Sequence, residues 1–497
     1  MASINNHILA ITEPTIKLDE VKFESFNEGE GNEKANTSKG YLLMVSINNY
    51  VFTDYDIVSM VIDCNGVLPM LDITLTDSLG VFNIDTFPRD GDVINIRIGT
   101  LEKTTYKDIR IDFDIIYAQA PPQKSNLKGA KYTFMGRIKV PGLFSEDCKS
   151  YGVGTSINHI ESIANDLKLG VATNIDSSDD SMHLVIPFNS RFDTLDDLVR
   201  HSYIDENSFQ TYCIDPYYYI NYVNLNLLMD SEETFETMIM AYELELADMP
   251  TLPNADSANQ LKTQLVLTNH VRNAGTNLSI EKHSIKNNAG AFLKKNGYKR
   301  VLQYFENDSD EGLVSHNIEP LSGKNMRDIE EPMRGRRDED RYKNEIKYKY
   351  VGRKSGDPDT ANTHLNYEYA AIHNSQNMDE VNKMSLDIEL ATFNPAIHRF
   401  HKIPVIIYTN ESAKMGADNS VKEKKEKDGF ETTVRDKEAP VNPGEYVVDE
   451  FLSGYYVVGG IEYYYKAGFQ SVKQRVNLLR REWPSRVNNI NNDTVKK

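Results

Sequence analysis

Apolar residues recur at every second position in three runs near the start of the chain. The runs are Leu71, Ile73 and Leu75; Ile94, Ile96 and Ile98; and Ile111, Phe113 and Ile115. Such alternation gives a strand one apolar face, and turn sequences such as Asp77-Ser-Leu-Gly and Pro88-Arg-Asp-Gly separate the runs. The pattern therefore predicts an antiparallel meander or β-barrel over residues 41–145.

Helical spacing replaces this alternation after residue 150. The apolar stripe comprises Ile157, Ile160, Ile163, Ala164 and Leu167, with Thr155 or Ser156 as the cap and Gly170 as the stop. A second helix is predicted to begin at Thr194-Leu-Asp-Asp, which fits a capping box. A strand over 217–227 follows. Together these segments predict a small α/β insertion domain over residues 146–230.

Strand patterns return towards the end of the chain, at Leu386-Asp-Ile-Glu-Leu, at Ile403-Pro-Val-Ile-Ile-Tyr and over 474–479. Gly459-Gly460 lies between two Tyr-rich runs and predicts a hairpin, because glycine supplies the positive φ that two-residue turns need. We therefore expect a second β-barrel over 376–486. It would be interrupted by a mobile loop at 411–443, which is rich in Lys, Glu, Asp and Gly.

One short pattern occurs twice. Leu71-Asp-Ile-Thr-Leu and Leu386-Asp-Ile-Glu-Leu look like the same strand, and an Ile-rich strand follows each of them. So short a match also arises by chance, so duplication and coincidence both stay open.

The remaining segments have polar or mixed compositions. Residues 1–40 predict a flexible N-terminal arm, and 487–497 a disordered tail, because neither contains enough apolar surface for a core. Residues 231–375 predict a peripheral mixed domain of unclear role. Its charged cluster over 327–353 mixes both signs, which is typical of exposed surface rather than of a phosphate-binding patch.

Composition is typical of a globular chain of several domains. The chain has 497 residues, of which 40% are apolar, so two to four domains are expected. No run approaches the roughly 18 apolar residues of a membrane-spanning helix. The first residues lack the features of a signal peptide, so we expect folding in a cytoplasm.

Charge and cysteine content argue against phosphate-backbone binding, a disulfide framework and a zinc site. A net charge of −19 argues against a surface that grips phosphate backbones, although it suits either a solvated acidic surface or a channel through which DNA slides. Cys64, Cys148 and Cys213 are odd in number and widely spaced. They therefore indicate neither a disulfide framework nor a zinc site.

No common catalytic motif is present. The sequence contains no Gly-x-x-x-x-Gly-Lys-Ser/Thr, no Gly-x-Ser-x-Gly and no His-Glu-x-x-His pattern. We therefore predict that the chain is not an enzyme, and we assign no catalytic, cofactor-binding or metal-ligating residue and no cofactor.

Four weaker patterns each have a functional and a structural interpretation. Gly152-Val-Gly154 suits an anion site or a helix-entry turn, and His398 with His401 suits a metal site or a turn into a strand. Residues 176–181 with His183 suit a hard cation or a plain loop. The Tyr-rich runs at 217–222 and 463–465 suit a sugar platform, a subunit contact or a core.

The order of the motifs resembles the baseplate hub protein of contractile-tailed bacteriophages, whose fold is shared with the N-terminal part of type VI secretion spike proteins. The matching segments are Asn65-Gly-Val-Leu-Pro-Met-Leu-Asp-Ile-Thr-Leu, Phe87-Pro-Arg-Asp-Gly-Asp-Val-Ile-Asn-Ile, Tyr132-Thr-Phe-Met-Gly-Arg-Ile-Lys-Val-Pro, Gly154-Thr-Ser, Leu169-Gly170, Ser178-Asp-Asp-Ser-Met, the run 209–226, and Arg480-Arg-Glu-Trp-Pro. They cover 45–230 and, more weakly, 380–486.

The resemblance implies a mainly β chain with an α/β insertion and two tube-like antiparallel β-barrels. Three such chains would form a pseudo-six-fold ring that joins the six-fold tail tube to the three-fold central spike and surrounds the channel for DNA. The implied partners are the spike, the tube or tube-initiator proteins, and possible wedge and tape-measure proteins. The implied location is the tail baseplate of a virion, assembled in the cytoplasm of a bacterial host.

Two alternatives remain open. The chain could be a hub-associated peptidoglycan hydrolase, with the activity inside 231–375, and a zymogram on peptidoglycan tests this. It could also be the hub of a non-viral contractile injection system. Detection of the chain in purified infectious particles separates that interpretation from the phage hub.

Overall fold

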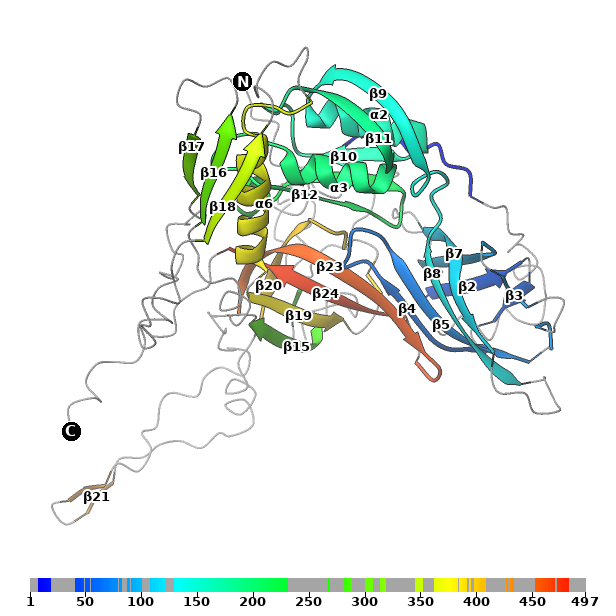
Figure 1. Ribbon diagram of the computed structural model, residues 1–497. Helices are drawn as coiled ribbons and strands as arrows, with labels where there is room; N and C mark the ends of the chain where they lie inside the picture. Colours follow the sequence, from blue (N-terminus) through cyan, green and yellow to red (C-terminus); the bar gives the residue numbers. More distant parts are fainter. Residues whose placement is uncertain are drawn as a thin grey trace, which may run out of the picture.

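In the computed structural model, most strands lie in one long, mainly antiparallel sheet (Figure 1). The structure describes residues 8–18, 41–120, 129–230, 280–287, 362–407 and 452–481, apart from short gaps, together with separate strands at 267–268, 300–306, 313–318, 345–351, 425–427 and 430–432. Within these residues, no helix is both long and apolar enough to cross a membrane.

The predicted first β region is made of β-strands. Its strands are β2 (Tyr41–Ile47), β3 (Tyr50–Phe52), β4 (Ile57–Asp63), β5 (Met70–Asp77), β6 (Val93–Thr100), β7 (Ile109–Gln119) and β8 (Ala130–Ile138). Leu71, Ile73 and Leu75 are buried in β5, whereas Asp72 lies exposed on the opposite face. The prediction from period-two alternation is therefore confirmed for this strand.

The α/β region contains two small sheets and three helices. Its elements are β9 (Glu146–Gly154), α2 (Ser156–Leu167), β10 (Gly170–Thr173), β11 (Met182–Ser190), α3 (Arg191–His201), β12 (Gln210–Ile214), β13 (Tyr219–Asn224) and α4 (Leu225–Asp230). Strand β9 pairs with β11, while β10, β13 and β12 are neighbours in the second sheet. Figure 1 shows this region packed beside the long sheet.

Both predicted helices exist, but their ends differ from the prediction. Helix α2 ends at Leu167, the cap residue Lys168 that follows has a φ of 61°, and Gly170 already belongs to β10. Helix α3 begins before Thr194, because Ser190 is the cap and its side chain accepts a hydrogen bond from the backbone of Asp193. Thr194 instead donates to the carbonyl of Ser190.

The strand predicted over 217–227 is shorter than expected. Asp215 accepts hydrogen bonds from the backbone N–H groups of Tyr217 and Tyr219, so a turn precedes β13. After Asn224 the chain enters α4, so Leu225 is helical. The apolar and Asn positions that suggested a continuing strand belong to this helix.

Part of the segment expected as a flexible arm is a strand. Strand β1 (Leu9–Thr12) pairs antiparallel with β10 at the edge of the α/β sheet, and Ile8 is buried beside it. Four residues give too little periodicity to be recognised, which is why the sequence did not predict this strand. Residues 1–7, 19–40 and 487–497 lie outside the described residues.

The second β region is assembled from distant segments. Its elements are β14 (Leu267–Thr268), β15 (Ile280–Asn287), α6 (Tyr367–Val381), β19 (Met384–Leu390), β20 (Lys402–Ile406), β23 (Gly454–Lys466) and β24 (Lys473–Leu479). Strands β16 (Arg300–Glu306), β17 (Leu313–Ile318) and β18 (Glu345–Val351) form a separate sheet. Strands β21 (Lys425–Lys427) and β22 (Phe430–Thr432) pair within the expected loop 411–443, whose other residues are not described.

The hairpin predicted at Gly459-Gly460 is wrong. Strand β23 runs straight through both glycines, with a bulge between Val458 and Gly460. A Cβ at Gly459 would lie 2.5 Å from the Leu479 side chain, and one at Gly460 would lie 2.0 Å from Asn65. The glycines are required by close packing against these neighbours rather than by a turn.

Helix α6 connects the α/β region to the second β region (Figure 1). His364 and His373 donate from Nε2 to the carbonyls of His201 and Ser208, at 2.7 and 3.0 Å. Asn374 donates to the carbonyl of Ser202 at 2.9 Å. The carbonyls of His201 and Ser202 lie at the C-terminal end of α3, so His364 and Asn374 provide hydrogen bonds that α3 cannot supply itself.

Candidate functional surfaces

Two sets of five strands have the same order in the long sheet. We call β4, β5, β8, β7 and β6 the first unit, and β15, β19, β24, β23 and β20 the second unit. Read in these orders, all neighbouring strands are antiparallel in both units. The repeated pattern Leu-Asp-Ile-x-Leu lies on the equivalent strands β5 and β19.

The two units also share their register. The equivalent rows are Leu71, Gly136 and Ile115 in the first unit and Leu386, Leu478 and Val458 in the second unit. Immediately after these rows, the fourth strands of both units, β7 and β23, contain a bulge, at Ile116 and at Gly459. A second pair of bulges lies opposite Leu75 and Leu390.

A left-handed turn residue repeats as well. Gly91 and Phe400 have φ values of 88° and 67°. Their backbone N–H groups donate to the carbonyls of Ile115 and Val458, which are equivalent residues. Two bulges and one strained turn at matching positions do not follow from chance similarity of five residues, so the topology favours duplication.

The two units are joined edge to edge in one sheet. The end of β23 pairs antiparallel with β4, with Glu462 opposite Asp63 and Tyr463 opposite Ile62. Cys64 donates to the carbonyl of Ile461 at 2.8 Å. The chain therefore contains two copies of the unit, and the pairing of β23 with β4 is the joint between them.

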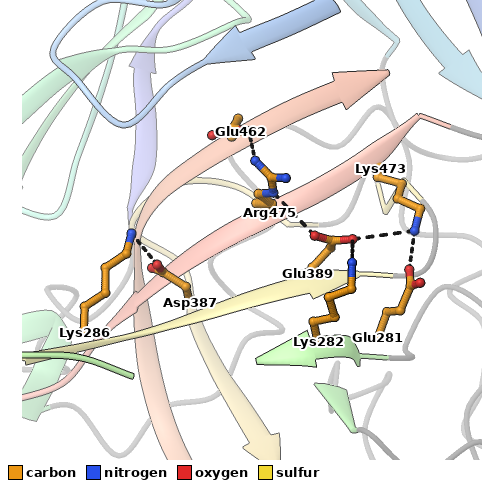
Figure 2. Close-up of polar contacts among 8 residues, drawn as sticks. All are labelled: Glu281, Lys282, Lys286, Asp387, Glu389, Glu462, Lys473 and Arg475. Carbon is orange, nitrogen blue, oxygen red and sulfur yellow. Dashed lines mark hydrogen bonds and ion pairs between the residues drawn. The ribbon is translucent and has the colours of Figure 1, made fainter. Parts of the chain in front are cut away.

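The outward face of the second unit carries a cluster of ion pairs, which we call the charge ladder (Figure 2). Its members are Glu281, Lys282, Lys286, Asp387, Glu389, Glu462, Lys473 and Arg475. Glu389 lies at its centre, 3.2 Å from Lys282, 3.5 Å from Arg475 and 3.6 Å from Lys473. The four cations and four carboxylates balance each other.

Electrostatics keeps the central carboxylate charged. Burial raises the pKa of Glu389, but hydrogen bonds from Tyr464 and Lys282 and the nearby charges of Lys282 and Lys473 outweigh burial, so its pKa lies below the usual value. A groove of about 800 Å³ lies over this face, and Arg399, Phe400 and Gly459 also line it. Paired charges of this kind suit a neutral polar surface rather than acid–base catalysis.

The charge ladder was not predicted from the sequence. A signal existed, because Asp387 and Glu389 alternate with buried Leu386 and Ile388, just as Lys473 and Arg475 alternate with buried Gln474. Each alternating run implies one polar face. Only the pairing of β19 with both β15 and β24 brings the opposite charges together. These strands are far apart in the sequence, so their pairing could not be predicted from it.

The histidine pattern lies in a buried turn before β20. The rings of His398 and His401 are 4.8 Å apart and nearly perpendicular, and Tyr217 packs against His398. Burial lowers the pKa of His398 to about 3. Among the described residues, no group of three or more His, Cys, Asp or Glu side chains is placed to hold a metal ion.

The acidic run at 176–181 is a loop that supports neighbouring backbone. Asp180 is fully buried, and its carboxylate accepts hydrogen bonds from the N–H groups of Ser156 and Tyr203. It therefore stabilises the start of α2. Gly152-Val-Gly154 ends β9, and Thr155 caps the helix that follows, which agrees with a helix-entry turn.

The Tyr-rich runs are part of the core. The buried tyrosine side chains are Tyr217, Tyr218, Tyr219, Tyr222, Tyr463, Tyr464 and Tyr465. Some hydroxyl groups link separate regions, since Tyr218 accepts a hydrogen bond from the backbone of Asp112 at 2.9 Å. A surface platform for sugar is not available from rings placed in this way.

No protein-family model matches the chain, and no curated protein matches it in sequence. Among solved structures, the chain is similar to the 43 kDa tail protein of prophage MuSo2 from Shewanella oneidensis, at 8% identity and a TM-score of 0.46, over 89% of this chain and 98% of that chain. A tail protein from Neisseria meningitidis MC58 gives 9% identity and a TM-score of 0.43, over 89% and 97%.

A third similar structure is the Escherichia coli c3393 protein, described as a component of the type VI secretion system with structural similarity to T4 bacteriophage tail proteins gp27 and gp5. It shows 8% identity and a TM-score of 0.39, over 89% of this chain and 79% of that chain. These structures belong to the classes that the sequence motifs resemble. At TM-scores below 0.5 they do not decide the function, which has to be inferred from the repeat within this chain.

Proposed function

We propose that this chain is the structural hub of a phage tail baseplate. As a homotrimer, it would join the six-fold tail tube to the three-fold central spike and surround the channel through which DNA passes. It would have no catalytic activity of its own. Its location would be the tail of the virion, after assembly in the cytoplasm of a bacterial host.

The observation that carries this proposal is the repeat of one five-strand unit in the same register. A chain with two similar units has approximate two-fold repetition along its sheet. Three copies around a three-fold axis then present six similar units, which is the symmetry that an adaptor between six-fold and three-fold structures requires. In this proposal the first unit belongs to a barrel over 41–145 and the second to a barrel over 376–486.

The domains outside the units would face away from the channel. The α/β domain over 146–230 and the segment 231–375 are candidates for contacts with wedge or tape-measure proteins. The tube or tube-initiator proteins and the spike would bind the two ends of the ring.

The charge distribution is compatible with passage of DNA. One chain carries −19, so three chains carry 3 × −19 = −57. In the charge ladder, each cation is held by a carboxylate, which leaves little free positive charge to bind phosphate. A ring of this composition would let DNA slide without retaining it.

The first test is the mass of the purified chain, measured by light scattering at several protein and salt concentrations. We expect a stable mass of three times 56.6 kDa, followed by a ring with pseudo-six-fold symmetry in electron micrographs. A chain that stays monomeric both alone and with its co-expressed spike would contradict the proposal.

A further inference from the structure

We propose that two copies of the chain join by adding the edge of β15 from one copy to the end of β7 from the next, in the register of the β23–β4 joint. This inference rests on the proposed trimer. It names the surface through which the trimer closes, and it identifies the partner as a second copy of this chain.

The joint within the chain is the template. There, the last strand segment of the second unit, Glu462 to Lys466, pairs with β4 of the first unit. The backbone N–H of Cys64 donates to the carbonyl of Ile461, so the neighbouring residues Asp63 and Glu462 form a non-hydrogen-bonded pair. In such a pair the two side chains lie closest together.

The repeat converts this template into a contact between copies. Strand β7 is equivalent to β23, and β15 is equivalent to β4. Because Ile115 is equivalent to Val458, Glu462 corresponds to Gln119. Because Ile62 and Ile285 lie opposite the equivalent residues Leu71 and Leu386, Asp63 corresponds to Lys286. The predicted joint therefore places Gln119 of one copy opposite Lys286 of the next.

Both edges are available within the described part of the chain. Strand β15 is the last strand at its end of the sheet and pairs only with β19 there. Strand β6 pairs with β7 only as far as Asp114, so the segment from Ile116 to Gln119 extends beyond it. On β23 this same side is occupied first by β20 and then by β4.

The exposure of one isoleucine marks the edge as incomplete. Ile62 is 0% exposed because β23 covers it in the joint within the chain. Its equivalent, Ile285, is 38% exposed at the edge of β15. Pairing with β7 of a second copy would cover Ile285 in the way that β23 covers Ile62, and burial of this apolar surface would stabilise the contact.

The chemistry of the predicted row permits the contact. Lys286 already pairs with Asp387, and Gln119 is neutral, so no like charges meet. Pro121-Pro122 follows after Ala120, and proline lacks the N–H that a ladder needs, so the joint is expected to be short. Three such joints between copies and three joints within chains would close six units into a ring.

The test is a disulfide across the predicted pair. In a Cys148→Ser background, which removes the exposed native thiol, Gln119→Cys is combined with Lys286→Cys. Directly opposed residues of this kind have the Cβ separation that a disulfide needs. Mild oxidation is expected to convert the double variant into covalent trimers on a non-reducing gel, whereas either single variant gives none.

Two controls make the register decisive. Gln119→Cys with Ser284→Cys moves the second thiol two residues along the same face and is expected not to cross-link. Asp63→Cys with Glu462→Cys should form a disulfide within one chain, which checks the template. Equal cross-linking of the shifted pair, or a trimeric mass without cross-linking of the predicted pair, overturns this joint and leaves the hub proposal standing. A monomeric mass with and without the spike overturns both.

Discussion

At the scale of single residues, the two glycines of β23 show how a side chain can be excluded by its neighbours rather than by backbone geometry. Gly460 packs against the loop residue Asn65, and Gly459 packs against Leu479. Neither has the positive φ that a turn would require. Close contact of β23 with the residues after β4 therefore depends on the absence of a Cβ.

We expect Gly460→Ala to destabilise the chain by about 1–3 kcal/mol, the usual cost of forcing a methyl group into a packed site. Its Cβ would also meet the Cα of Asn65 at 3.1 Å, so a rotation of the Asn65 side chain does not relieve the clash. Gly66→Ala is the matched control, because its nearest neighbour would be 3.8 Å away. The difference between their denaturant midpoints measures the effect, and equal midpoints would contradict the contact.

Single residues were predictable where one local rule acts alone. Alternation identified Ile73 as a core residue, and it is fully buried. The end of α2 was misplaced because Lys168 adopts a left-handed conformation that usually favours glycine. Gly459-Gly460 was misinterpreted because the contact that requires glycine comes from Asn65, which is distant in sequence.

At the scale of elements, the charge ladder links the strands β15, β19, β24 and β23 through their outward side chains. Glu389 is its most buried carboxylate, at 11% exposure, and contacts cations from two neighbouring strands. Cross-strand pairs of opposite charge add to the stability that backbone bonds provide. The ladder thus stabilises the edge where β15 is the last strand.

Replacing the central carboxylate tests this role. Glu389→Gln leaves Lys282, Lys473 and Arg475 close together without their shared anion, and we expect a loss of about 1 kcal/mol, because solvent screens the exposed cations. Glu281→Gln, at the 41% exposed rim, is expected to cost less. Urea unfolding of both variants at low and high salt provides the measurement, and a wild-type midpoint for Glu389→Gln would show that the ladder adds no stability.

Strong periodicity made the main elements predictable, and short or irregular elements were not. Strand β5 and helix α2 have clear patterns over eight and twelve residues. Strand β1 and helix α4 have only four and six residues. The start of α3 was misplaced because Thr194-Leu-Asp-Asp fits a capping box, whereas the residue that caps the helix is Ser190, one helical turn earlier.

At the scale of the whole molecule, buried histidines make the free energy of unfolding depend on pH. Burial lowers the pKa of His159, His364 and His373, although the backbone carbonyls that they contact oppose this effect. Burial alone lowers the pKa of His398 to about 3. The four side chains lie in the α/β region, in and beside α6, and in the turn before β20.

Stability should therefore fall as the pH falls below about 6.5, the value for histidine in an unfolded chain. Below that value the unfolded chain binds protons that the folded chain excludes, and the folded state takes up the proton of His398 only near pH 3. The free energy of unfolding, measured with denaturant from pH 7.5 to 5, is expected to decrease continuously. His398→Asn should reduce the slope, and an unchanged slope would show that this buried histidine is not responsible for it.

The overall architecture was only partly predictable. Composition and pattern indicated a mainly β chain with an α/β insertion, and the repeated Leu-Asp-Ile-x-Leu hinted at duplication. The pairing of β23 with β4 could not be predicted from the sequence, because it joins residues about 400 positions apart. The pattern of each strand shows which face is buried but not which strand lies beside it. Which distant strands pair depends on how all the strands pack together, and a local sequence pattern carries no information about that packing.

Strand β23 has a mechanical consequence for the molecule. Its thirteen residues are bonded to β24 on one side and to both β20 and β4 on the other. Sliding one unit past the other would require many backbone hydrogen bonds to break together, and no flexible linker lies between the units at this strand. A force applied to one unit, such as a pull or a twist along the sheet, would pass directly to the other, and the two would tilt as one rigid plate.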